Sequence, residues 1–129
     1  MGRDKVSNHT FLTAVAANGV GTSMPVTDFQ NIVFWIATAS SGNLTVKCQA
    51  SIAETEPTWG SAQSTTNKWN YVALSDMEDG TLDTSFVVTG TDDYKLYQLY
   101  ATGVRWVNFE VSGYAAGSVS AEAWAISNT

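Results

Sequence analysis

The sequence contains little of what metal centres and catalytic sites need. Cys48 is the only cysteine and His9 the only histidine among 129 residues. One cysteine cannot form an intrachain disulfide, and one cysteine with one histidine cannot supply the four ligands of a structural zinc site. A lone histidine is usually structural, because nucleophilic catalysis needs a base placed beside the nucleophile. We therefore predict no catalytic residues, no resident metal and no cofactor.

Charged side chains are also scarce. They make up 14% of the chain, against about 25% in ordinary soluble domains. Acidic residues outnumber basic ones by 12 to 6, and much of the acidic excess falls within residues 54–93. Nucleic-acid binding is disfavoured, because phosphates require a basic surface.

Long apolar runs are missing as well. No run approaches the roughly 20 residues of a membrane-spanning helix. The first six residues, MGRDKV, lack the apolar segment of a secretory signal peptide. We therefore expect neither a membrane partner nor a signal peptide.

Residues 104–126 carry the clearest structural pattern in the chain. Two runs of apolar side chains alternate with polar ones, which is the period of a β-strand. Gly113 and Gly117 stand between the runs and supply the positive φ angles that a short connection needs. We predict a long hairpin here, with Phe109 on its apolar face. The side chains expected to face the core are Val107, Phe109, Val111, Val119, Ala121, Ala123 and Ala125.

The rest of the chain also predicts strands and shows no helical period. Residues 31–39 are apolar at both parities, so we predict a strand covered on both faces, followed by a turn. Residues 44–52 alternate, with Cys48 as a core side chain. Further strands are expected near residues 9–16, 24–26, 69–74, 82–89 and 94–100. These eight or nine short strands predict an all-β fold, an antiparallel, jelly-roll-like β-sandwich, with a closed barrel as the alternative.

The length of the chain indicates one domain. Residues 1–8 are polar and charged, so we expect an N-terminal arm that is either disordered or held by a neighbouring subunit. Residues 9–129 are expected to form the single β-sandwich domain.

An acidic turn occupies residues 76–83, where four acidic side chains surround Gly80. Oxygen ligands at this spacing can wrap Ca²⁺, but the segment does not match an EF-hand loop. It also lacks the apolar pocket that would raise the pKa of a carboxylic acid for glycoside hydrolysis. We interpret the segment as an acidic β-turn and leave bound Ca²⁺ as the alternative.

Aromatic residues are the remaining candidates for a binding role, with five Trp and five Tyr in the chain. Exposed rings can stack on sugars or fill subunit interfaces. Trp59 stands alone in the polar residues 53–68, while Trp106 and Trp124 lie on the parity opposite the core residues of their strands. We select Trp59, Trp106, Trp124 and Tyr114 as candidate interface or sugar-stacking residues.

Several segments together resemble a known class of proteins. They are residues 18–23 (NGVGTS), 44–47 (LTVK), 69–74 (WNYVAL), 94–100, 103–107 (GVRWV) and 111–120 (VSGYAAGSVS), together with Ser51 and Trp59. In this order they resemble small β-sandwich proteins from the virions of tailed bacteriophages, of the kinds that decorate heads or build fibres and tail accessories. The likeness runs from about residue 10 onward.

The resemblance implies a non-enzymatic structural role on a virus particle and brings no catalytic residues with it. The short N-terminal segment has no fibre repeat or coiled-coil stalk, which favours a compact capsid decoration or cement subunit, or a tail accessory. The expected partners are other virion proteins and further copies of the chain, and the expected location is the virion after synthesis in the host cytoplasm. The alternative, from another class, is a carbohydrate-binding module that recognises a glycan on the host surface.

Overall fold

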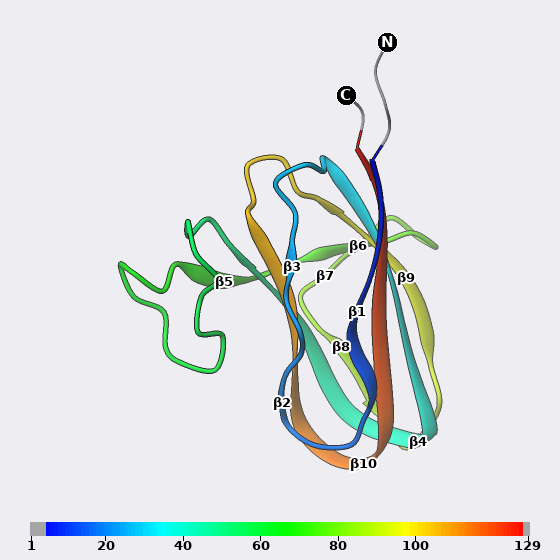
Figure 1. Cartoon of the computed structure of the whole chain (residues 1–129). Helices are drawn as coiled ribbons and strands as arrows, with labels where there is room; N and C mark the ends of the chain where they lie inside the picture. Colours follow the sequence, from blue (N-terminus) through cyan, green and yellow to red (C-terminus); the bar gives the residue numbers. More distant parts are fainter. Residues whose placement is uncertain (1–4, 128–129) are drawn as a thin grey trace.

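The computed structural model describes residues 5–127, which form ten strands, each antiparallel to its neighbours (Figure 1). The strands are β1 (Lys5–Val15), β2 (Gly19–Val20), β3 (Met24–Pro25), β4 (Asn31–Ser51), β5 (Trp69–Val72), β6 (Leu74–Asp76), β7 (Leu82–Asp83), β8 (Phe86–Thr89), β9 (Tyr94–Tyr100) and β10 (Trp106–Ser127). No helix in the described residues is long and apolar enough to cross a membrane. The predicted all-β antiparallel fold is confirmed, with two strands much longer than expected.

These two long strands, β4 and β10, organise the molecule. They pair with each other along most of their length, from Trp106 opposite Ser51 to Ala125 opposite Ile32. Both curve halfway, at the bottom of Figure 1. One hydrogen-bonded sheet is thereby folded over into two layers.

The order of strands defines the two layers. The first contains β1, the second half of β10, the first half of β4, then β9, β6 and β7. The second contains the first half of β10 and the second half of β4, flanked by β2 and β3 on one side and by β5 and β8 on the other. The apolar core fills the space between the layers.

The hairpin predicted over residues 104–126 is wrong. Its two runs belong to one strand and pair with β4 rather than with each other. Gly113 and Gly117 do have positive φ angles, 59° and 79°, but they bend the strand without reversing it. The turn predicted after residue 39 is a matching bend inside β4, where Ser40 and Ser41 have φ angles of 60° and 57°.

The two bends lie against each other and leave no room for a side chain at Gly117. A Cβ atom there would lie 2.6 Å from the Cα of Gly42 and 2.7 Å from the carbonyl oxygen of Ala39. The Tyr114 hydroxyl donates to the Gly117 carbonyl oxygen at 2.8 Å, and the Gly90 N–H donates to the Gly42 carbonyl oxygen at 2.8 Å. The corner is therefore fixed from both strands.

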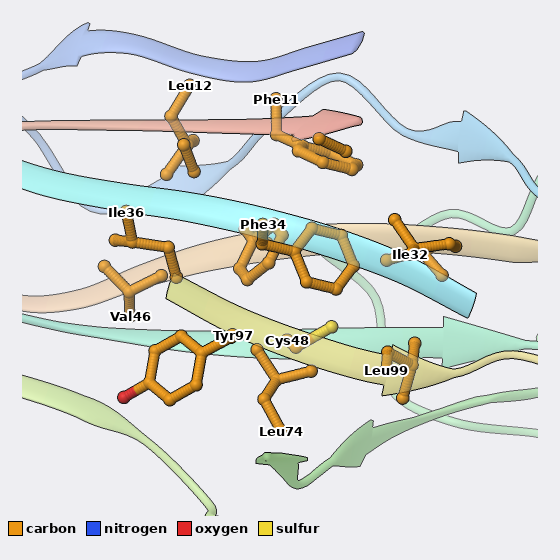
Figure 2. Close-up of a cluster of buried hydrophobic side chains, with 14 of the residues drawn as sticks. Phe11, Leu12, Ile32, Phe34, Ile36, Val46, Cys48, Leu74, Tyr97 and Leu99 are labelled. Carbon is orange, nitrogen blue, oxygen red and sulfur yellow. The ribbon is translucent and has the colours of Figure 1, made fainter. Parts of the chain in front are cut away.

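Three phenylalanines lie at the centre of the core, and Figure 2 labels two of them, Phe11 and Phe34. The ring of Phe109 meets those of Phe11 and Phe34 edge to face, with centroids 4.9 Å and 5.1 Å apart. Ala123 lies opposite Phe34 in the neighbouring strand, so its small side chain leaves space for the ring. All seven side chains of β10 predicted to face the core are buried.

Cys48 is buried in the same core, as predicted. Burial raises the pKa of its thiol, because the thiolate would lose its hydration between the layers. Cys48 therefore fills space as an apolar side chain and is not an activated nucleophile.

Strand β1 begins inside the segment that we expected to form an arm. Val6 lies opposite Ile126 and Asn8 opposite Trp124, so these residues extend the first layer. Their backbone N–H and C=O groups pair with the free edge of β10. A polar sequence does not prevent this pairing. The arm prediction is wrong for residues 5–8, and residues 1–4 lie outside the described residues.

The first half of β4 is covered on one face only. Ile32, Phe34 and Ile36 are fully buried between the layers, but Trp35 on the other parity keeps 39% of its surface exposed. The prediction of a strand covered on both faces is therefore wrong. An apolar run at both parities does not by itself show that a second element packs on the outer face.

The packed corner leads to a prediction for Gly117. Gly113→Ala should lower the free energy of unfolding by about 1–2 kcal/mol, which is the penalty for an L residue in the left-handed region. It adds no clash, because a Cβ at Gly113 meets nothing within 4 Å. Gly117→Ala adds a clash with backbone atoms and should cost about 1–3 kcal/mol more. Urea melts of the two variants measure the difference between their free energies of unfolding. Equal losses of stability would contradict the close approach of the two bends.

Candidate functional site

Residues 53–68 form a loop with defined internal contacts, drawn in green at the left of Figure 1. The Asn67 side-chain amide donates to the carbonyl oxygens of Thr58 at 2.9 Å and Ala62 at 3.1 Å, and its oxygen accepts the Thr58 N–H at 2.7 Å. The Gln49 amide, fully buried on the second layer, donates to the Trp59 carbonyl oxygen at 3.4 Å. The loop is thus attached to the outer surface of that layer.

Trp59 is buried within this loop, with 5% of its surface exposed. Its ring lies 6.4 Å from that of Trp69, whose indole N–H donates to the Ser61 carbonyl oxygen at 3.0 Å. The selection of Trp59 as an interface or sugar-stacking residue required an exposed ring and is wrong, because the loop folds this indole inward and so removes it from water. Trp59 cannot stack on a sugar or a partner in this arrangement.

Trp106 and Tyr114, two further candidates, are half-buried. The Trp106 indole N–H donates to the Ala53 carbonyl oxygen at 3.1 Å, at the start of the loop. Tyr114 closes the corner of β10 through its hydroxyl. Both rings therefore support the fold, and of the four candidates only Trp124 is exposed, at 41%.

A cluster of apolar side chains lies on the outside of the first layer, and we call it the aromatic face. It consists of outward-facing side chains from four neighbouring strands: Val6 of β1, Val33 and Trp35 of β4, Tyr94 and Leu96 of β9, and Trp124 and Ile126 of β10. Tyr94 is 58% exposed and Leu96 45%. Apolar side chains gathered on one face are more informative than the same residues scattered singly.

The strand register brings these rings together. Trp124 lies opposite Val33, and Trp35 lies opposite Leu96. The rings of Trp35 and Tyr94 stack nearly parallel, with centroids 5.9 Å apart and planes at 14°. Two shallow hollows share Trp35 as a wall, one of about 210 Å³ toward Trp124 and one of about 280 Å³ toward Tyr94.

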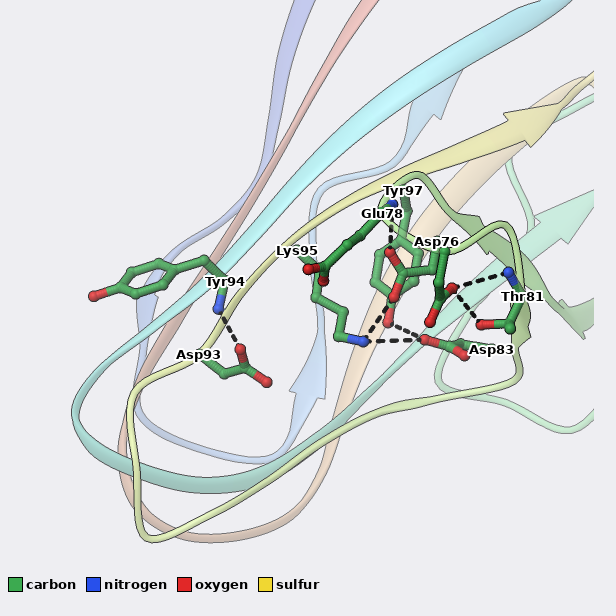
Figure 3. Close-up of polar contacts among 9 residues, drawn as sticks. Asp76, Glu78, Thr81, Asp83, Asp93, Tyr94, Lys95 and Tyr97 are labelled. Carbon is green, nitrogen blue, oxygen red and sulfur yellow. Dashed lines mark hydrogen bonds and ion pairs between the residues drawn. The ribbon is translucent and has the colours of Figure 1, made fainter.

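A polar cluster lies beside the aromatic face (Figure 3). Lys95 Nζ lies 2.8 Å from the buried carboxylate of Asp76 and 3.6 Å from that of Asp83, and the Tyr97 hydroxyl donates to Asp83 at 2.8 Å. The hydrogen bond from Lys95, followed by that from the Glu78 N–H, lowers the pKa of Asp76. The same bond to Asp76 raises the pKa of Lys95. Burial, with the bond to Asp83, raises the pKa of Tyr97.

Three of the four carboxylates of the acidic turn, those of Asp76, Asp79 and Asp83, have partners within the fold. Asp79 accepts the N–H and the hydroxyl of Thr81 at 3.0 Å and 2.7 Å, and this bonding lowers its pKa. Within residues 5–127, no group of three or more His, Cys, Asp or Glu side chains is placed to hold a metal ion. The acidic β-turn is the interpretation that this geometry supports.

His9 is also held by the fold. Its Nε2 lies 2.7 Å from the Thr22 carbonyl oxygen, and its ring meets that of Phe11 edge to face at 4.6 Å. This partner is a backbone carbonyl and not a nucleophile. The contacts described for His9 therefore bring it no nucleophile to activate.

The buried position of Trp59 leads to a second prediction. Phe109→Ala should cost about 3–5 kcal/mol, because it removes a ring from the centre of the core. Trp59→Ala should lower the free energy of unfolding by clearly more than the roughly 0.5 kcal/mol typical of surface substitutions. This holds even though the ring of Trp59 lies outside the main core. Denaturant melts test this, with the exposed loop residue Thr65→Ala as control. A loss for Trp59→Ala no larger than that of the control would show that the loop does not pack on the sheet.

The Asp76–Lys95 pair leads to a third prediction. Because the folded pKa of Asp76 is lowered, its stabilising effect is complete well above the unfolded value of about 3.9 and disappears as pH falls through the folded pKa. The stability difference between wild type and Asp76→Asn should therefore be constant near neutral pH and shrink below about pH 4. Urea melts from pH 2 to 8 measure it, with Glu78→Gln on the same turn as control. A difference that does not change with pH would contradict the assigned role of Asp76.

Comparison with known proteins gives matches at the level of structure only. No family model and no curated protein sequence matches this chain. The structure of the SPBc2 prophage-derived protein YomS matches with a TM-score of 0.75 at 17% identity, over 98% of this chain and 97% of that one. The PBSX exported protein XepA matches with a TM-score of 0.72 at 12% identity, over 96% of this chain but only 38% of that one.

A third match lies farther away. The VP2 subviral particle of infectious bursal disease virus has a TM-score of 0.52 at 12% identity, over 98% of this chain and 33% of that one. Identities this low show a shared fold. The resemblance to small β-sandwich proteins of bacteriophages is therefore confirmed at the level of the fold, most directly by YomS.

Proposed function

We propose that the chain is a non-enzymatic structural subunit of a bacteriophage particle, either a capsid decoration or cement protein or a tail accessory. It acts by assembling with further copies of itself and with other virion proteins. The observation that carries this proposal is the fold match to the prophage-derived protein YomS across nearly the whole of both chains. The more distant match to VP2, seen in a subviral particle, supports a fold suited to building shells.

Exposed apolar side chains at the strand edges support assembly. Leu82 on β7 is 71% exposed and Val87 on β8 is 57% exposed. Within the described chain β7 pairs only with β6, and β8 only with β4, so each has an edge without a partner strand. An unpaired edge with an apolar side chain beside it can dock on another subunit.

Particle composition tests the proposal most simply. Particles produced by the phage or prophage that encodes the chain should contain it in many copies, detected by mass spectrometry and placed by electron cryomicroscopy. If purified particles lack the chain, the structural role is wrong.

Self-assembly makes a fourth prediction. Light scattering of the purified chain should show a homo-oligomer, and Val87→Lys should shift it toward the monomer because a charge on the docking edge loses its hydration. Ile52→Lys is the matched control, since Ile52 is an apolar residue of similar exposure, 60%, that lies on neither β7 nor β8. A monodisperse monomer for the wild type at high concentration would contradict self-assembly.

A further inference from the structure

The hollow between Trp35 and Trp124 on the aromatic face has a mixed apolar and polar lining. Its volume is about 210 Å³, and Val33 and Leu96 line it together with the two indole rings. Asn8 and Glu122 place an amide and a carboxylate on the same surface, since Asn8 lies opposite Trp124 and Glu122 opposite Trp35. Apolar walls with a few convergent polar groups are typical of small-molecule sites.

The charge of this surface limits what can bind there. Among the described residues that line the hollow, Glu122 carries the only charge. In the neighbouring hollow, Lys95 is bound to Asp76 and lies beside Glu78. An anionic ligand would therefore meet carboxylates and no free cation. The described chain offers no hydrogen-bond partner to the side chains of Asn8 and Glu122, which leaves them available to hydroxyl groups.

One of the two indole rings, that of Trp35, is held in position before any ligand arrives. Trp35 stacks on Tyr94 at a plane angle of 14°, which restricts its rotation. Rigid rings provide contact area at a low cost in conformational entropy. Their π faces are electron-rich, so they attract the weakly positive C–H groups on the apolar face of a sugar ring.

We propose that the aromatic face binds a neutral oligosaccharide. Trp35 and Trp124 contact the faces of a sugar ring, Glu122 accepts hydrogen bonds from its hydroxyls, and Asn8 donates and accepts them. The second hollow, on the Tyr94 side of Trp35, receives an adjoining sugar unit. This activity goes beyond the proposed structural role and does not rest on it.

A second copy of the chain is the competing occupant of this face. Glu122 lies between Thr10 on β1 and Trp35 on β4, which places it inside the face. A two-fold contact through the same surface of both copies would bury two such carboxylates without a basic partner from the hollow. A hydroxyl-bearing ligand satisfies the carboxylate, and this difference favours the oligosaccharide.

A glycan array with the labelled full-length chain tests the proposal, followed by titration of tryptophan fluorescence with chitohexaose, cellohexaose and maltohexaose. We expect binding to at least one neutral oligosaccharide, stronger for the hexamer than for the monosaccharide, and none to 3′-sialyllactose. Trp124→Ala and Trp35→Ala should each weaken binding at least tenfold, and Glu122→Gln should weaken it while the circular dichroism spectrum stays unchanged.

Tyr71→Ala is the matched control, because Tyr71 is an aromatic side chain of similar exposure, 38%, on the second layer. It should leave the affinity unchanged. An array without any neutral hit overturns the proposal, as does binding that survives both tryptophan substitutions. If Trp124→Ala instead dissociates an oligomer of a wild-type chain that binds no glycan, the aromatic face is a contact between copies. Particle composition is measured separately, so failure here leaves the structural role standing.

Discussion

The contact between Gly42 and Gly117 is the constraint on which the rest of the structure depends. At this point β4 and β10 bend together, and a single additional carbon on Gly117 would come within 2.6 Å of the Gly42 backbone. Because the backbones meet so closely, two strands of 21 and 22 residues pass from one layer to the other and stay paired on both sides of the corner, with shifts of register at the corner itself. Both layers therefore share the same two central strands, and the apolar core forms between the two layers.

The same bend produces two outer surfaces with different properties. The second layer is covered by residues 53–68, which bury Trp59 and the amide of Gln49. The first layer has no comparable cover within the described chain, and Trp35 and Trp124 stay exposed on it. The sparse charge of the chain makes this difference stronger, since the aromatic face includes few charged groups to hydrate it. Assembly and ligand binding can thus use separate parts of the molecule.

The period-two pattern was enough to predict the class of fold and the core side chains of β10, because burial on one side of a strand selects every second residue. It was not enough to predict the path of the chain. Gly113 and Gly117 have the positive φ angles expected of a turn, yet the same angles bend a strand when its partner bends beside it. The sequence holds no local sign that Ser40 and Ser41 form that partner bend.

The candidate site was less predictable, for reasons of tertiary contact. Trp59 lies among polar residues, and only the docking of its loop on the second layer shows that it is buried. Trp35 was missed because its neighbours on both parities are apolar, which is typical of a fully covered strand. Its proximity to Tyr94 and Trp124 follows from pairing between distant segments, which strand periodicity does not specify. Trp124 was found because its parity opposes the core alanines of β10.

The central claim is that the chain assembles into a particle while its aromatic face stays open. Hydroxyl-radical footprinting of intact particles, compared with the isolated chain, tests this claim most directly. The structure predicts that Trp35 and Trp124 are oxidised at similar rates in both, while Trp59 is protected in both. Strong protection of Trp35 and Trp124 in the particle alone would contradict the account, since it would make the aromatic face an assembly contact.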